Sequence, residues 1–225
     1  NWRSKCDDPD KYAYEEYYKA LEFSYDKRLR EMGEPKENSC TTHLSVVDKD
    51  GNMVSLTQTL LSVFGSRVVL PESGILMNNG IMWFDPRKGK PNSLSADKKP
   101  LCNMCPTIVL EKSGKKIAMG ASGGRRIFPA VFQIISFLID YNMDLNNAFS
   151  TPRIDYSGEN RILANENLKQ DIINKLNYYK KTVKVPDSVF SHLFAAPNAV
   201  MSDFKGNKYG NAYIPSPWSS TLSSE

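Results

Sequence analysis

Residues 41–59, TTHLSVVDKDGNMVSLTQT, decide the fold that this sequence predicts. Apolar side chains alternate with polar ones on both sides of a turn segment, residues 48–52, at the two-residue period of a half-buried strand. The alternating apolar positions are Leu44, Val46, Val54 and Leu56. The pattern predicts a hairpin that turns at Asp50-Gly51, with one apolar face buried.

Two threonines lie at the ends of this predicted hairpin. Thr41 opens the first strand, and Thr59 lies on or just past the end of the second, so antiparallel pairing brings them within hydrogen-bonding reach. If the chain were cut before Thr41, its α-amine, with a pKa near ~8, could accept the proton of its own hydroxyl. Threonines are also simply good strand residues, and spacing alone favours that structural explanation.

Three blocks of sequence, in this order, resemble the small catalytic subunit of the γ-glutamyltransferases, members of the N-terminal-nucleophile hydrolase superfamily. They are TTHLSVVDKDGNMVSLTQT (41–59), ESGILMNN (72–79) and MGASGGRRI (119–127). The resemblance covers the chain from about Thr41 almost to its end. It implies that a precursor cuts itself between Cys40 and Thr41, that Thr41 is the nucleophile, and that Thr59 hydrogen-bonds to it.

The same resemblance implies the fold and the division of the chain. The fold class is α+β, an αββα sandwich, of which this chain holds mostly the small-subunit half and a large subunit completes the sheets. Residues 1–40 correspond to the tail of the large subunit and residues 41–225 to the small catalytic subunit. The partners implied are that large subunit and a small-molecule γ-glutamyl or related amide substrate.

Residues 8–32 are predicted to form the helix of that tail. Asp8 and Pro9 fit a cap followed by a first-turn proline, Gly33 and Pro35 end the helix, and a polar linker runs to Cys40. Tyrosines recur along it at helical spacing, and packing of an amphipathic helix explains them more simply than a ligand platform.

The substrate pocket departs from the pattern of relatives. In the family, the neighbourhood of Asn79 holds the α-amino and α-carboxylate groups of the substrate, and relatives carry Asn, Gln and Asp where this chain has Leu61, Gly80 and Trp83. These replacements supply no oxygen for a buried ammonium. Asp85 is near, but Pro86 after it favours a turn aspartate.

Two further segments bear on the substrate. The polar loop 87–99 is shorter than the lid of lidded γ-glutamyltransferases, as in the acylase branch of the family. Relatives bind the α-carboxylate with two serines at the positions of Cys102 and Asn103; the Asn103 amide can still donate, whereas a thiol is a weak donor. A metal or redox role for Cys102 and Cys105 is disfavoured, because His43 and His192 are isolated and a strand follows instead of a helix.

Gly123 and Gly124 stand where a predicted strand, residues 117–120, leads into an apolar helix, residues 127–141. Glycines before a helix leave backbone N–H groups able to face an anion, although a tight turn between strand and helix is the usual explanation. The family resemblance makes them the donors of an oxyanion hole. The apolar helix is predicted to be buried against the sheet.

Composition adds limits and little more. A net charge of +4 without a basic stripe indicates neither a nucleic-acid partner nor a membrane patch, and no apolar run reaches the ~18 residues of a membrane helix. Four cysteines are too few for a disulfide scaffold, so the compartment is undetermined. The remaining predicted elements are hairpins 107–120 and 199–213, a short helix after Asp144 and a helix 165–178.

The resemblance therefore implies acyl transfer from a γ-glutamyl amide by Thr41, with no metal or organic cofactor. One alternative keeps the nucleophile and changes the substrate to a side-chain amide, as in cephalosporin acylases. Another is that the chain is an unprocessed fragment without activity, since an uncut Thr41 has no basic amine.

Overall fold

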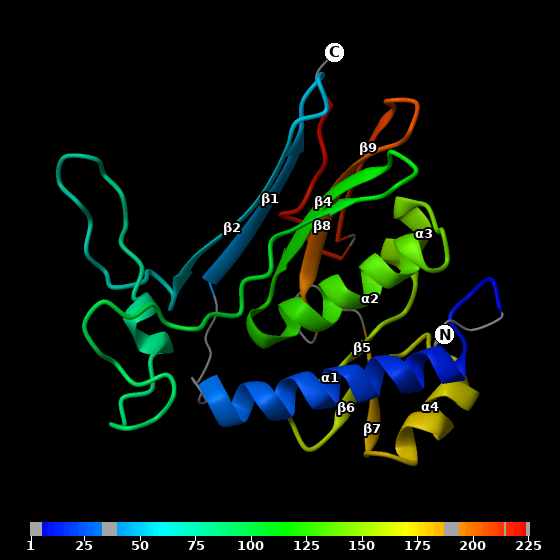
Figure 1. The fold of residues 1–225 in the computed structure, drawn as a ribbon, viewed down its shortest axis with the longest axis horizontal. Coiled ribbons are helices and arrows are strands. Elements are labelled where there is room, and N and C mark those ends of the chain that lie inside the picture. The colour runs from blue at the N-terminus through cyan, green and yellow to red at the C-terminus, as the bar shows by residue number, and fades with distance from the viewer. Residues whose placement is uncertain (1–5, 33–39, 187–193, 214, 224–225) are drawn as a thin grey trace.

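The computed structural model describes residues 6–32, 40–186, 194–213 and 215–223 of a mixed α/β fold (Figure 1). The predicted linker, His192 and the last two residues lie outside these ranges. The helices are α1 (Lys11–Met32), α2 (Ile127–Ile139), α3 (Leu145–Ser150) and α4 (Gln170–Asn177), with 3-10 turns η1 (Gly80–Trp83) and η2 (Gly124–Arg126). The strands are β1 (Cys40–Val47), β2 (Met53–Leu61), β3 (Thr107–Leu110), β4 (Lys116–Ser122), β5 (Ile154–Asp155), β6 (Ile162–Asn165), β7 (Thr182–Val185), β8 (Ala196–Ser202) and β9 (Lys208–Ala212).

The strands form separate sheets that pack in layers. β1 and β2 make the hairpin, β3-β4-β8-β9 an antiparallel central sheet, and β5-β6-β7 a smaller sheet in which β6 and β7 are parallel. The hairpin packs on β4 and β8, and α2 packs on the same two strands from the other side (Figure 1). As its apolar sequence predicts, α2 is buried, with Ile134 and Phe137 fully inaccessible to solvent.

Helix α1 packs on the rest of the chain through its tyrosines. Tyr14, Tyr17, Tyr18 and Tyr25 are all at most 3% exposed and belong to the same core cluster as α2 and β4, which confirms the packing interpretation. The predicted cap at Asp8 is wrong. Asp10 caps the helix instead, because its carboxylate accepts the N–H groups of Tyr12 and Ala13, both at 3.0 Å.

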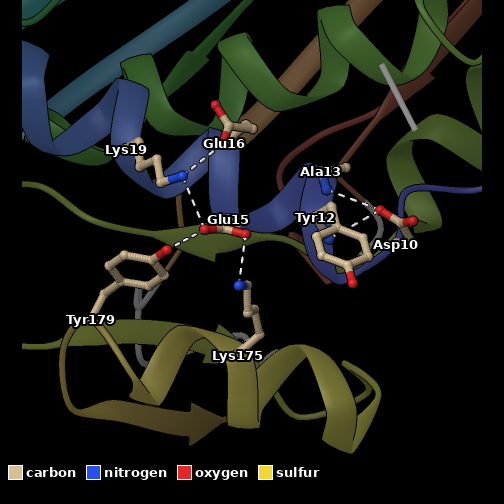
Figure 2. Close-up of polar contacts among 8 residues, drawn as sticks. All are labelled: Asp10, Tyr12, Ala13, Glu15, Glu16, Lys19, Lys175 and Tyr179. Carbon is tan, nitrogen blue, oxygen red and sulfur yellow. Dashed lines mark hydrogen bonds and ion pairs between the residues drawn. The ribbon is translucent and has the colours of Figure 1, made fainter. Parts of the chain in front are cut away.

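A polar contact joins α1 to α4. Glu15, on α1, accepts a hydrogen bond from Tyr179 and forms ion pairs with Lys175 of α4 at 3.0 Å and with Lys19 at 2.9 Å (Figure 2). The α1 helix is thus held to the downstream part of the chain by charge as well as by its aromatic face.

The hairpin confirms the predicted strands and turn but not the predicted burial of its apolar face. The exposed fractions are 54% for Leu44, 42% for Val46, 51% for Val54 and 40% for Leu56. The polar face packs on the central sheet instead: the His43 ring lies where a Cβ on Gly120 would stand, and the Ser55 hydroxyl donates to the Met119 carbonyl at 2.9 Å. Because the His43 ring packs against β4 and the Ser55 hydroxyl bonds to it, the alternating pattern is satisfied with the apolar side turned outward.

Other predicted elements differ mainly at their ends. The helix expected over residues 165–178 begins only at Gln170, because Asn165 is the last residue of strand β6. The two predicted hairpins form as β3–β4 and β8–β9, and Asp144 caps α3 by accepting the Asn147 N–H at 2.8 Å. Among the described residues, no helix is both long and apolar enough to cross a membrane.

Candidate active site

The two threonines meet at the open end of the hairpin. Thr41 pairs with Thr59 in the ladder, and the Thr41 hydroxyl donates to the Thr59 hydroxyl across 3.0 Å. Thr59 Oγ1 in turn donates to the Cys40 carbonyl at 3.0 Å and accepts the Leu61 N–H at 2.9 Å. One hydroxyl therefore contacts both the Thr41 side chain and the carbonyl of the peptide bond that precedes Thr41.

The backbone is irregular at this point. The ladder shifts register between Cys40 and Thr41, so that Cys40 pairs with Leu61 while Thr41 pairs with Thr59. Leu61 has φ +70°, in the left-handed region that a non-glycine residue seldom occupies. Bulges and such strained residues are concentrated at functional sites, where they direct a side chain or a peptide group.

A cavity of about 570 Å³ opens beside the threonines. Its wall is formed by residues from the hairpin end and from the long connection between β2 and β3. The residues that line it are Cys40, Thr41, Thr42, Thr57, Gln58, Thr59, Leu60, Ile75, Leu76, Met77, Asn78, Trp83 and Met104. Away from the threonines the side chains are mostly apolar, so the cavity offers Thr41 and Thr59 to a ligand with an apolar portion.

Of the predicted pocket residues 79, 80 and 83, only Trp83 lines this cavity. The Asn79 amide is engaged locally, since its Oδ1 accepts the Ser62 N–H at 3.0 Å and its Nδ2 donates to Ser62 Oγ at 2.8 Å. Gly80 is buried at the start of η1, and a Cβ there would lie 3.0 Å from the Trp83 ring. Both residues shape the wall from behind.

Cys102 and Asn103 also lie outside the cavity lining, although the next residue, Met104, belongs to it. The Arg28 guanidinium donates a hydrogen bond to the Asn103 Oδ1. Both cysteines of the C-x-x-C segment are free thiols. Within the described residues, no group of three or more His, Cys, Asp or Glu side chains is arranged to hold a metal ion.

Gly123 and Gly124 form the turn between β4 and α2, as the sequence predicts. Gly123 has φ +137°, and a Cβ on it would come within 2.8 Å of the Ala195 backbone, so glycine is required there for the fold alone. Gly124 has φ +59°. Neither glycine lines the 570 Å³ cavity or a smaller cavity of about 160 Å³, which is lined in part by Thr42, His43 and Ser122.

His43 is a structural residue next to the threonines. Its Nδ1 lies 2.8 Å from Thr57 Oγ1 and its Nε2 3.0 Å from Ser45 Oγ. Burial lowers the pKa of the His43 imidazole to about 4, so the ring is neutral at physiological pH. A neutral imidazole suits a packing contact with Gly120, whereas a general acid in catalysis would need the protonated ring.

Asp85 proves to be the turn residue that its sequence context favours. Asp85 is 6% exposed, and its carboxylate accepts the backbone and side-chain N–H groups of Arg87. The hydrogen bonds from Arg87 lower the pKa of Asp85 to about 2. The carboxylate is therefore occupied by its neighbour and does not line the cavity.

Sequence reasoning missed Gln58, Asn78 and Met104 as cavity residues. Gln58 directly precedes Thr59, and its pairing with Thr42 follows from the same hairpin register, so that signal was present. Met104 is brought to the threonines only by the path of a long irregular connection, which no periodic pattern reveals.

Comparison with known proteins places this site in a family context. The family model described as gamma-glutamyltranspeptidase matches residues 4–209. The glutathione hydrolase proenzyme of Bacillus subtilis strain 168 is 32% identical over 177 residues, which are 79% of this chain and 29% of that protein. The acylase ACY 1 proenzyme of Pseudomonas sp. strain SE83 is 39% identical over 118 residues, 52% of this chain and 21% of that protein.

Solved structures agree with these sequence matches. An acivicin-inhibited gamma-glutamyltranspeptidase, whose C-terminus is described as critical for its autoprocessing and catalysis, superposes with a TM-score of 0.65 and 31% identity. The match covers 79% of this chain and 100% of that solved chain. The present chain thus spans less than a third of the curated relatives' length but the whole of one solved relative's chain.

Proposed function

This chain belongs to the gamma-glutamyltranspeptidase family, and we propose that it carries the nucleophile of a γ-glutamyl acyl transfer or hydrolysis reaction. Thr41 is the proposed nucleophile, released by cleavage of the Cys40–Thr41 bond. Residues 1–40 are then the tail of a large subunit, and residues 41–225 form the small catalytic subunit.

The observation that carries this proposal is the hydrogen-bond chain from Thr41 through Thr59 to the Cys40 carbonyl. A donor on that carbonyl polarises the bond to be cut, and the same hydroxyl orients the Thr41 side chain. After cleavage the carbonyl leaves with Cys40, and Thr59 keeps its contact with the nucleophile. One threonine thus supports both the maturation step and the reaction.

The proposed reaction balances without a cofactor. Thr41 Oγ1 attacks the amide carbonyl of the substrate while the free α-amine of Thr41 takes the hydroxyl proton. The tetrahedral intermediate collapses to an ester on Thr41. The C–N bond of the substrate amide breaks, and the departing substrate amine takes the proton from the Thr41 α-ammonium group. Water or a second amine then attacks the ester and restores the threonine. Gly123 and Gly124 are the proposed donors to the oxyanion, and Cys102 and Asn103 the proposed contacts of the substrate carboxylate.

The apolar face of the hairpin supports the partner in this proposal. Leu44 and Val54 are about half exposed on the outer face of the hairpin. Within the described part of the chain, the central sheet covers the opposite, polar face of the hairpin. In an αββα sandwich such a face needs a further layer, because a sheet that is apolar on one side buries that side. The large subunit is the proposed source of this layer.

A second candidate is an acylase acting on an amide without a free glutamyl head. The cavity favours it: Leu76, Met77 and Trp83 stand in a wall whose described residues include no carboxylate for a substrate ammonium. The similarity to the acylase ACY 1 proenzyme also supports this second candidate. A γ-glutamyl anilide and a glutaryl amide, offered in parallel to the same protein, separate the two candidates by relative kcat/KM.

The test of the proposal uses the complete precursor. Intact mass and N-terminal sequencing should find a chain that begins at Thr41, and Thr41→Ala should give an uncut protein with turnover lower by at least about a thousandfold. Full turnover by Thr41→Ala would refute the proposal. A single uncut species in the wild-type protein, with no turnover, would identify the chain as a non-catalytic form.

A further inference from the structure

Helix α1 reaches two parts of the candidate site from one of its faces. Tyr25 and Arg28 are three residues apart, so their side chains project from the same side of the helix. The Tyr25 hydroxyl donates to the backbone carbonyl of Arg125, and the Arg28 guanidinium donates to the Asn103 side chain. These contacts touch the glycine turn and the segment proposed for the substrate carboxylate.

We propose, on the premise of the function above, that Tyr25 and Arg28 are positioning residues for the glycine turn and for Asn103. Because α1 lies upstream of the Cys40–Thr41 bond, the piece released by cleavage would remain a working part of the active site. It would hold the site through non-covalent contacts once the chain is cut.

The contact of Tyr25 fixes the end of the glycine turn. Arg125 follows Gly124 directly, and its carbonyl lies in the turn that starts α2. In an α-helix this carbonyl would accept a hydrogen bond from the N–H four residues on, but that residue is Pro129, which has no N–H. The tyrosine hydroxyl supplies a donor at that carbonyl. The peptide planes before it, which carry the proposed oxyanion donors, are thereby held from a residue outside the turn.

Tyr25 itself has little room to shift. It is 3% exposed, and the β5–β6 turn presses on α1 so closely that a Cβ on Gly158 would lie 2.6 Å from Leu29 and 3.8 Å from the Tyr25 ring. In the glycine turn itself, Arg126 Nε lies 4.0 Å from the buried carboxylate of Asp155 on β5. The glycine turn is therefore held by α1 and β5 together as well as by the end of β4.

Arg28 sets the orientation of the Asn103 side-chain amide by donating a hydrogen bond to its oxygen. A guanidinium only donates, so the amide atom it contacts must be the oxygen, and the NH₂ group is what the side chain can offer to an anion. Arg28 also brings a positive charge beside that amide, which favours a carboxylate there. We therefore expect Tyr25 to affect the chemical step and Arg28 to affect substrate affinity.

The test compares matched tyrosines in the complete, cleaved protein. Tyr25→Phe removes one hydroxyl that donates to a backbone carbonyl; Tyr14→Phe removes another on the same helix, whose acceptor is the Pro152 carbonyl, away from the turn. With the substrate that the wild-type protein turns over, Tyr25→Phe should lower kcat about tenfold with KM within about twofold, whereas Tyr14→Phe should keep both. Equal kcat for the two variants would overturn the role of Tyr25.

The matched pair for the second residue is Arg28→Gln and Arg30→Gln, since the Arg30 guanidinium contacts only its own helix, at the Asp26 carbonyl, among the contacts that the described residues show. Arg28→Gln should raise KM about tenfold at unchanged kcat, with Arg28→Lys in between. An unchanged KM would overturn this role.

Two controls keep the outcomes distinct. Where a variant stays uncut, co-expression of the two parts as separate chains removes the need for cleavage. Loss of turnover in Thr41→Ala together with normal kinetics in both α1 variants would refute the present inference alone. Normal turnover in Thr41→Ala would instead refute the proposed function.

Discussion

Helix α1 buries most of its aromatic side chains, whereas the β1–β2 hairpin leaves the apolar side chains of its outer face exposed. Four tyrosines of α1 are at most 3% exposed, namely Tyr14, Tyr17, Tyr18 and Tyr25. Their hydroxyls reach partners such as Ser136, 2.9 Å from Tyr17, and the Pro152 carbonyl. Leu44 of the hairpin is 54% exposed while its polar neighbours pack inward. The element upstream of the proposed cleavage position thus buries most of its aromatic side chains within this chain, whereas the hairpin that carries the threonines leaves its apolar face exposed.

The difference indicates where the chain depends on something else. A segment that leaves on cleavage would be expected to pack weakly, yet α1 contributes to the main core cluster and to the contacts around the glycine turn. The hairpin contributes polar contacts to the sheet and leaves an apolar face for another layer. Cleavage at Cys40–Thr41 would therefore separate the chain without separating the core.

The largest effect that tests this comparison is expected for Tyr17→Ala. The Tyr17 side chain is fully buried, so its removal should lower the free energy of unfolding of the complete protein by about 3–5 kcal/mol. Tyr12→Ala, at 56% exposure on the same helix, should change it by less than about 1 kcal/mol. Denaturant unfolding measures both, and similar values for the two variants would mean that α1 is only loosely held.

A smaller effect is expected from acid titration of His43. Burial lowers the pKa of this histidine from 6.5 to about 4 in the folded state, so protonation favours the unfolded chain. The contribution is fully present above pH 6.5 and is lost as the pH falls from 6.5 to 4, by up to about 3 kcal/mol.

His43→Gln tests the assignment of this titration. The variant should lose this part of the pH dependence, while His192→Gln, at the only other histidine, serves as the control. Unfolding midpoints measured between pH 7 and pH 4 should converge for the wild-type protein and His43→Gln on acidification. A pH dependence unchanged in His43→Gln would assign the titration to another group.

A third prediction concerns the exposed face directly. In the complete protein Leu44→Glu should weaken association of the two proposed subunits, by about 1–2 kcal/mol, because a carboxylate would be placed in a contact between apolar surfaces. Leu110→Glu, on β3 at 71% exposure, is the matched control and should leave association unchanged. Dilution followed by size-exclusion chromatography gives the dissociation constants. Equal values for the two variants would show that the large subunit does not cover the hairpin.

The sequence predicted much of the fold because its local signals agree. Alternation around the Asp50-Gly51 turn fixes the register that places Thr41 opposite Thr59, and the continuous apolar run of α2 indicates a helix buried on more than one side. The mismatch at the start of α1 is a matter of two residues, since both Asp8 and Asp10 are competent caps and only the backbone path decides between them.

The sequence could not reveal contacts between distant segments, nor which face of the hairpin is covered. Alternation shows that a strand has two unlike faces, but the inward face is decided by what lies opposite: here Gly120 makes room for the His43 ring. Likewise Arg28 and Asn103 are 75 residues apart, and Met104 joins the cavity only through the fold. These pairings depend on tertiary geometry, for which a single sequence carries no periodic signal.

The smallest expected effect concerns the Glu15 cluster that joins α1 to α4 (Figure 2). Burial raises the pKa of the Glu15 carboxyl, but hydrogen bonds from Tyr179, Lys19 and Lys175 outweigh it and lower the pKa to about 2. A lowered pKa stabilises the fold above the ordinary carboxyl pKa, and this contribution is lost as the pH falls from about 4.5 towards 2.

Glu15→Gln keeps the shape of the side chain and removes the charge, so it should cost less than about 1 kcal/mol at pH 7 and nothing near pH 2. Glu16→Gln is the control, because Glu16 contacts Lys19 at 2.8 Å but pairs with no residue of α4 among the described residues. Thermal unfolding at both pH values separates the two positions. A loss at Glu16 equal to that at Glu15 would mean that the pairing with Lys19 stabilises α1 itself, and that the aromatic face alone holds α1 to the rest of the chain.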